Sequence, residues 1–206
     1  METLTKLFGN ATKVKVIKQF VFNKETPFDI QIIALRTKDT ATKVRAEVSL
    51  LEKMDLIKRK VFFKTVHRKS GGKSVSLRVK SNGWMLNENF EFLMQLQTFL
   101  VSLNHLSPKY IVRKLNRGGV MKLIIISGIF IQNPESRIDL LVVGDHLKKG
   151  VIDSAIKTIE SEIGSEIRYA VFETADFQYR FGLYDKLVRD ILDFPHDKVL
   201  NKLGII

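Results

Sequence analysis

The chain has 206 residues, of which 45% are apolar and 27% are charged, and its formal net charge is +12. The apolar fraction excludes a wholly disordered chain, because there is enough apolar surface to offset the entropy lost on folding. The absence of cysteine excludes disulfides, thiolate metal sites and cysteine nucleophiles. The excess of positive charge favours a polyanionic partner.

Hydropathy gives no sign of a membrane segment. The longest run of apolar, glycine or serine residues spans 123–131, whereas a membrane-spanning helix needs ~20 apolar residues. The first twenty residues carry lysines throughout and show no signal-peptide pattern. We therefore expect no membrane association and a cytoplasmic location.

The first half of the chain reads as three helices. Asn10 is a cap for a helix that reaches about residue 22, with apolar positions repeating every three or four residues. Thr26 and Pro27 mark the start of a second helix that ends near Arg36, since proline suits the first helical position. A third helix is predicted over residues 40–54.

A hairpin follows these helices. Residues 56–66 and 74–79 are rich in β-branched and aromatic residues, which predicts two strands. The glycine-containing loop between them carries the cations Arg68, Lys69 and Lys73. The hairpin therefore ends in a basic tip.

Residues 8–80, and above all the segments 26–36 and 40–54 with the loop HRKSGGK, resemble a winged helix-turn-helix of the ArsR-like and MarR-like kind. In that family the third helix enters the major groove and the wing follows the phosphates. The resemblance implies contacts with double-stranded DNA. The implied residues are Arg36, Thr42, Lys43, Arg45 and Ser49 on the helices, and Arg68, Lys69 and Lys73 on the wing.

Residues 88–103 are predicted to form a further helix. Its apolar stripe consists of Phe92, Leu96, Phe99 and Leu103. Such a stripe is either core of the linker region or a dimerisation face. Because two-fold DNA sites favour two-fold proteins, we expect a homodimer.

The second half alternates strands and helices. We predict helices over 108–115, 149–163 and 174–193, and strands over 121–131, 137–143, 167–172 and 198–206. The segments IIISGIFI and ESRIDLLVV resemble the minimal nucleotidyltransferase domain of the DNA polymerase β type. That family carries a Gly-Ser pair followed by two aspartates, which hold two Mg²⁺ ions.

The sequence departs from the family pattern at its catalytic positions. Gly-Ser is replaced by Ser127 and Gly128 in the opposite order, and the first aspartate is replaced by Arg137, so that only Asp139 remains. Glu173 lies at the end of the strand on which a third acid is expected. One carboxylate beside a guanidinium does not attract two metal ions, so we expect a degenerate domain with no catalytic residues, no metal and no cofactor. Arg137 could instead grip a phosphate group.

Charge and resemblance together predict the organisation. Residues 1–107 contain 19 Lys/Arg and 9 Asp/Glu, whereas residues 108–206 contain 15 and 13, so the excess charge lies in the first half. We expect a DNA-binding domain over 1–87, a linker or dimerisation helix over 88–107, and a nucleotidyltransferase-like domain over 108–206.

The expected fold class is α+β, with an N-terminal winged helix-turn-helix followed by a small α/β domain. The expected function is that of a DNA-binding transcriptional regulator. Its second domain either senses a small phosphate-bearing effector or supports assembly. Two alternatives stay open: an active nucleotidyltransferase whose winged helix presents the substrate, and an antitoxin-like protein that occupies a partner enzyme.

Overall fold

The computed structural model describes residues 2–70, 73–103, 106–133 and 135–205. The chain is a mixed α+β protein, as predicted, and it divides into two compact units. Unit 1 consists of residues 1–103 with 161–165, and unit 2 consists of residues 104–160 with 166–206. Within the described ranges, no helix has both the length and the apolar character that crossing a membrane requires.

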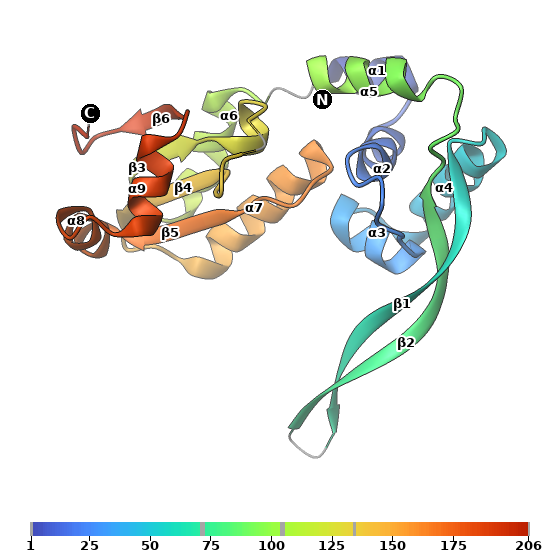
Figure 1. Cartoon of the computed structure of the whole chain (residues 1–206), viewed down its shortest axis with the longest axis horizontal. Coiled ribbons are helices and arrows are strands. Elements are labelled where there is room, and N and C mark those ends of the chain that lie inside the picture. Colours follow the sequence, from blue (N-terminus) through green and yellow to red (C-terminus); the bar gives the residue numbers. More distant parts are fainter. Residues whose placement is uncertain (1, 71–72, 104–105, 134, 206) are drawn as a thin grey trace. The chain divides into compact units, whose positions relative to one another are not determined.

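Unit 1 contains five helices and a long β-ribbon in its described part (Figure 1). The helices are α1 (Glu2–Phe8), α2 (Ala11–Val21), α3 (Ile30–Thr37), α4 (Ala41–Lys53) and α5 (Leu93–Ser102). The side-chain oxygen of Asn10 accepts a hydrogen bond from the Lys13 amide, which confirms the predicted cap of α2. Thr40 caps α4 in the same way, through the Lys43 amide, and α4 lies within the predicted range 40–54.

The start of α3 differs from the prediction. The cap is Asp29, whose carboxylate accepts a hydrogen bond from the Ile32 amide at 2.9 Å, and the helix begins at Ile30 rather than at Pro27. Phe28, between Pro27 and the cap, is extended and forms an antiparallel bridge with Trp84. Thr26 and Pro27 therefore precede the helix, because the bridge to Trp84 holds Phe28 in an extended conformation.

The ribbon is formed by β1 (Ile57–Ser70) and β2 (Lys73–Leu86), which pair antiparallel from Ile57 opposite Leu86 to Ser70 opposite Lys73. It extends from the helices as a twisted two-stranded hairpin (Figure 1). Both strands are longer than predicted. The residues Ser81, Asn82 and Gly83 are of types common in turns, but they continue β2. Glycine is needed at position 83 because the Phe28 backbone lies against it: an added Cβ would be 2.3 Å from the Phe28 carbonyl oxygen.

One apolar core holds the helices of unit 1 to the base of the ribbon. Its buried members come from every helix and from both strands. Among them, Val44, Val48 and Leu51 form the apolar buried side of α4. α5 begins at Leu93, later than the predicted residue 88. Its buried Leu100 and half-buried Leu96 pack on the core of unit 1.

Unit 2 is built on a four-stranded sheet in the order β5-β4-β3-β6. The strands are β3 (Val120–Ile126), β4 (Leu140–Asp145), β5 (Tyr169–Glu173) and β6 (Asp197–Asn201). β3 runs antiparallel to β4 and β6, whereas β4 and β5 are parallel. The other elements are α6 (Pro108–Leu115), η1 (Asn116–Gly118), η2 (Gly128–Phe130), α7 (Lys149–Ile163), α8 (Thr174–Gly182) and α9 (Lys186–Asp193).

Both faces of this sheet are covered. Leu123, Ile125 and Leu141 pack with Phe177 of α8 and Ile191 of α9. Their neighbours in β3 and β4 are also buried and point to the opposite face, since side chains alternate along a strand. This double burial explains why the strands read as continuous apolar runs.

Several predicted bounds in unit 2 were wrong. The apolar run 121–131 is not one strand, because β3 ends at Ile126 and a 3₁₀ turn follows from Gly128. The helix predicted over 174–193 is broken into α8 and α9. Tyr184 has a left-handed backbone with φ 55°, and the Asp185 carboxylate caps α9, so the chain turns between the two helices.

Candidate functional site

α4 exposes a polar, basic face. Its buried positions are Val44, Glu47, Val48 and Leu51, which leaves the other side of the helix in contact with solvent. The residues predicted to face DNA all lie on that exposed side: Thr42, Lys43, Arg45 and Ser49. A helix that presents short polar side chains beside an arginine and a lysine is suited to the major groove, where these groups read base edges and phosphates.

The turn between α3 and α4 is held by a lysine of α2. Lys15 Nζ donates to the Thr37 carbonyl at 2.8 Å and lies 3.4 Å from the Asp39 carboxylate. These contacts satisfy the C-terminal end of α3 and hold the turn against α2. Lys15 therefore stabilises the turn that connects α3 to α4.

The far side of α4 is fixed by a buried carboxylate. Glu47 Oε1 accepts a hydrogen bond from Asn10 Nδ2 at 2.7 Å, and Lys13 Nζ lies 3.9 Å from Glu47 Oε2. Asn10 also caps α2. α4 is therefore tied to the first turn of α2, and its exposed face has a defined direction.

Arg36 lies apart from the other predicted contacts. Its guanidinium is half-buried and stacks over the Phe28 ring, 4.9 Å from the ring centroid. This cation–π contact holds Arg36 beside the Phe28–Trp84 bridge.

The ribbon has two different faces beyond its base. Residues directly opposite in an antiparallel pair share a face, so Phe63, Thr65, Arg78 and Lys80 lie on one face. Arg78 stacks over the Phe63 ring at 4.8 Å, and Phe63 is 57% exposed. The opposite face carries Val66, Leu77 and Val79 together with Lys64, which pairs with Asp29. The first face has two cations beside an exposed aromatic ring, whereas the second is mainly aliphatic and its lysine is paired within the chain.

Asp29 joins the ribbon to α3. One carboxylate oxygen caps α3, while the other accepts hydrogen bonds from Lys64 Nζ and from Ser81 Oγ, the latter at 3.0 Å. Burial alone would raise the pKa of Asp29, but the bonds from Lys64, the Ile32 amide and Ser81 outweigh it and lower this pKa. Sequence reasoning missed this cluster. The sequence does contain a signal for the cap, because Asp29 stands three residues before Ile32, as a capping aspartate does.

The tip of the ribbon lies partly outside the described structure. Arg68, Lys69 and Lys73 belong to β1 and β2 by their backbone, but their side chains lie outside the described residues, as do Gly71 and Gly72. Their predicted contacts with the DNA backbone stay predictions.

In unit 2, Asp139 lies just before β4 and is 1% exposed. Its two oxygens accept four hydrogen bonds: Oδ1 from the Ile129 amide and Arg168 Nη2, and Oδ2 from the Arg168 amide and Nε, all at 2.9–3.0 Å. Both oxygens are therefore saturated by protein donors. The bond with Asp139 also raises the pKa of Arg168.

Ser127 and Gly128 have structural roles beside Asp139. Gly128 has φ +52°, and an added Cβ would lie 1.9 Å from Asp139 Oδ1, so only glycine fits against this carboxylate. Ser127 Oγ donates to the Pro195 carbonyl at 2.6 Å and lies 2.8 Å from Ser136 Oγ. The two residues close the end of β3 around the buried carboxylate of Asp139, whose partner Arg168 is half exposed.

Arg137 and Glu173, the other residues considered at the predicted nucleotidyltransferase site, bind other parts of the chain than Asp139 does. Arg137 Nη1 donates to Asp190 of α9 at 2.9 Å, with 63% of the Arg137 side chain exposed. Glu173 accepts a hydrogen bond from the Leu147 amide at 2.9 Å. Among the described residues, no group of three His, Asp or Glu side chains could hold a metal ion. Sequence reasoning missed Arg168, which gave no local signal.

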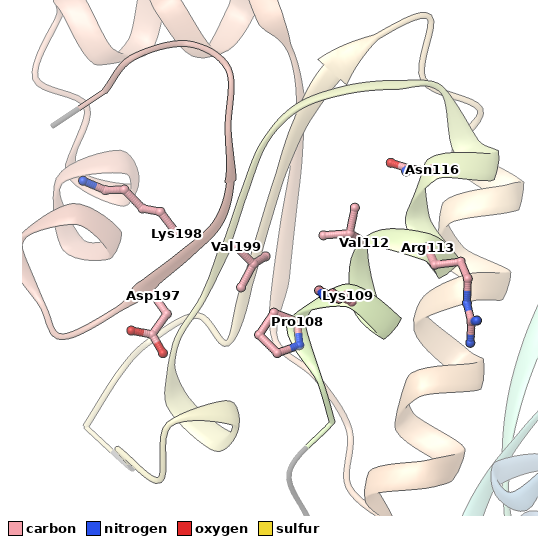
Figure 2. A pocket seen from close by; sticks show the side chains of 8 residues that line it. All are labelled: Pro108, Lys109, Val112, Arg113, Asn116, Asp197, Lys198 and Val199. Atoms are coloured by element: carbon pink, nitrogen blue, oxygen red, sulfur yellow. The ribbon is translucent and has the colours of Figure 1, made fainter.

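A hollow of about 820 Å³ lies between α6 and β6 (Figure 2). Pro108, Val112 and Val199 give it an apolar wall. Its other lining residues are Lys109, Arg113, Asn116, Asp197 and Lys198. The excess of cations over carboxylates suits a ligand that is apolar in part and anionic in part.

A second hollow, of about 610 Å³, lies in unit 1 beside α5. It is bordered mainly by apolar side chains of α1, α4 and α5 and of the segment before α5. Phe92 and Phe99 of the predicted dimerisation stripe line it, and they are 55% and 37% exposed. Leu96 is half-buried against the core, so only part of the stripe is available to a partner.

Comparison of the chain with protein-family models, with curated proteins and with solved structures finds no match.

Proposed function

We propose that the protein is a DNA-binding transcriptional regulator, in which unit 1 is a winged helix-turn-helix and unit 2 is a nucleotidyltransferase-like domain without transfer activity. The observation that carries the proposal is the exposed face of α4, with Lys43 and Arg45, in the half of the chain that holds nearly all the excess charge. Duplex DNA is the polyanion whose major groove accepts a single helix.

The order of elements in unit 1 supports the winged-helix assignment. α2 is followed by the extended Phe28, by α3 and α4, and then by the ribbon, and Phe28 pairs with Trp84 of β2. In this arrangement the ribbon is the wing. Its cationic face, with Arg78 and Lys80, supplies phosphate contacts in addition to those of the tip.

The test is a binding titration with a pool of random 30-base-pair duplexes, repeated at several salt concentrations. If about five phosphates are contacted, log K falls with log salt at a slope near −4 to −5. Selection of bound duplexes then gives the preferred sequence. A binding constant that does not change with salt contradicts the proposal.

Two arginines separate sequence reading from phosphate binding. Arg45→Ala is expected to weaken binding to the selected sequence by ~1–3 kcal/mol and to relax its specificity, whereas Arg68→Ala weakens binding to all duplexes about equally. Lys186→Ala, an exposed cation on α9 of unit 2, is the matched control and leaves binding unchanged. Equal effects of all three substitutions contradict the assignment of α4.

The absence of transfer activity is proposed from the state of Asp139. A carboxylate that already accepts four protein hydrogen bonds has no lone pair for Mg²⁺, and transfer needs two or three such carboxylates. The test is incubation with each labelled nucleoside triphosphate, Mg²⁺ or Mn²⁺, and RNA or protein acceptors. Label transfer that is lost in Asp139→Asn overturns this part of the proposal.

Homodimer formation and effector binding complete the proposal. Phe92 and Phe99 beside the α5 hollow offer one apolar surface for a second copy. The hollow between α6 and β6, with Lys109 and Lys198, offers a place for a small phosphate-bearing effector. The double variant Lys109→Ala, Lys198→Ala should then remove the effect of the effector on DNA affinity. Arg137→Ala tests the alternative that Arg137, which already pairs with Asp190, binds the phosphate of the effector.

A further inference from the structure

The two edges of the sheet in unit 2 differ in how they are protected. β6 pairs with β3 through a register shift between Ile124 and Ile125 and carries the charged pair Asp197 and Lys198. Bulges and charges are common devices that keep an edge strand from pairing with another chain. β5 pairs with β4 residue by residue, without a shift, and contains no proline and no lysine. β5 is therefore the open edge.

The outward backbone groups of β5 follow from its bonds to β4. The Arg168 carbonyl accepts hydrogen bonds from the amides of Asp139 and Leu140, so it faces β4. Successive residues of a strand direct their backbone groups to opposite sides, so the amide and carbonyl of Tyr169 and Val171 face away from β4. In the described part of the chain no strand lies on that side.

We propose that β5 pairs antiparallel with β5 of a second copy of the chain, about a two-fold axis through Val171. A two-fold contact places the same strand opposite itself. In this register Ala170 lies opposite Phe172 of the second copy, a small side chain against a large one. Tyr169 lies opposite Glu173, which places a phenol near a carboxylate. The strand is thus complementary to itself in size and in polarity.

A hollow of about 510 Å³ beside β5 supports a second copy as the occupant. It is lined by Tyr169, Val171 and Glu173 of β5, together with Leu147, Lys149, Ile152 and Asp153. Cross-strand neighbours share a face of the sheet. The same three side chains of the second copy therefore enter this hollow, and their Glu173 approaches the charge of Lys149.

The inference deepens the homodimer of the proposed function and does not depend on DNA binding. The absence of cysteine allows a clean test by single-cysteine variants of the full chain. In the proposed pair, the Val171 Cα atoms lie ~5.5 Å apart, which is within the range of a disulfide. Val171→Cys is expected to form a cross-linked dimer under mild oxidation at least tenfold faster than Val120→Cys, a 51% exposed control.

The register is tested with two further variants. Tyr169→Cys and Glu173→Cys should cross-link efficiently when mixed and poorly when each is oxidised alone. Equal cross-linking of Val171→Cys and Val120→Cys overturns the inference, and so does efficient cross-linking of Tyr169→Cys with itself.

Val171→Pro tests the contact without cross-linking. Its amide faces outward, so proline removes no bond to β4 and is tolerated on an edge strand; an unchanged circular dichroism spectrum checks the fold. The variant should have the monomer mass by light scattering at a concentration at which the unmodified chain is dimeric. If Val171→Pro stays dimeric while Phe92→Glu becomes monomeric, the self-contact lies at α5 and the inference is wrong. A chain that cross-links at Val171 but binds no DNA contradicts only the proposed DNA-binding function.

Discussion

The arginines of unit 2 and the cations on the outer surfaces of unit 1 are used in opposite ways. Arg137, Arg168, Arg180 and Arg189 of unit 2 each form an ion pair with an aspartate. In unit 1, Lys43, Arg45 and Lys80 have no acidic partner among the described residues. These four arginines are therefore paired within their own unit, whereas the three cations of unit 1 are available to an external polyanion.

Within unit 1 the change from paired to available cations follows the structure. Lys13, Lys15 and Lys64 pair with acids where α2 and the ribbon base meet the other helices. Glu52 of α4 also pairs with Arg59 near the start of β1. Beyond these contacts, the remaining outward residues of the ribbon include no acid, whereas they include the cations Arg78 and Lys80. The net charge of the chain is thus concentrated on surfaces that its own carboxylates do not reach.

The largest expected effect concerns the buried carboxylate of Asp139 in unit 2. Asp139→Ala leaves Arg168 and two backbone amides without their acceptor and should lower the free energy of unfolding of unit 2 by about 3 kcal/mol. Urea unfolding followed by far-ultraviolet circular dichroism reports this loss, while fluorescence of Trp84, the only tryptophan, reports unit 1. DNA binding should be unchanged. A fall confined to the fluorescence transition would contradict the assignment.

The second expected effect concerns Asp29. Asp29→Asn keeps an oxygen that can cap α3 but removes the negative charge that pairs with Lys64, and we expect unit 1 to lose about 2 kcal/mol of stability, measured by Trp84 fluorescence in urea. Asp176→Asn, in an exposed ion pair of α8, is the control and should change stability by less than about 0.5 kcal/mol.

The same residue predicts a pH dependence. The pKa of Asp29 in the folded chain is lowered, so the folded state binds this proton less readily than the unfolded state does. The stability that Asp29 contributes is complete above the ordinary aspartate pKa of about 3.9 and is lost as the pH falls through the lowered value. Asp29→Asn should therefore be less sensitive to pH in the acid range than the unmodified chain. Equal acid sensitivity of both would show that Asp29 is not the group responsible.

A smaller effect is expected on the cationic face of the ribbon. Arg78→Ala and Lys80→Ala should each weaken DNA binding about fivefold, without regard to sequence, and reduce the salt slope by about one. Lys202→Ala in unit 2 serves as the control. A change in the preferred DNA sequence would mean that the ribbon reads bases rather than phosphates.

The smallest effect is expected at Arg137. Its pair with Asp190 is exposed on the arginine side, so Arg137→Ala should change stability by less than about 1 kcal/mol. Thermal unfolding of the variant checks this. A loss comparable with that of Asp139→Ala would show that the Arg137–Asp190 pair holds α9 to the sheet.

Features set by neighbours in sequence were predictable. Asn10 and Thr40 cap their helices because the cap is a contact over three residues, and α7 follows its apolar periodicity over the predicted range. Signals that depend on distant packing were misread. Gly83 resembles a turn residue, but the chain needs glycine there because the Phe28 backbone lies against it.

The candidate site divides in the same way. The exposed positions of α4 could be read from its period. The partner of Asp139 could not, because Arg168 lies 29 residues away and only the parallel pairing of β4 with β5 brings them together.

The length of the ribbon has a consequence for how protomers are spaced. Each strand has 14 residues, and at about 3.3 Å per residue an extended strand of this length measures about 46 Å. One turn of a DNA duplex measures about 34 Å. If unit 1 binds DNA as proposed, with α4 in one groove and the ribbon along the duplex, the ribbon reaches beyond a full turn. We then expect the hairpin rather than the helix to set the site size of one protomer and to limit how densely copies can occupy a stretch of DNA.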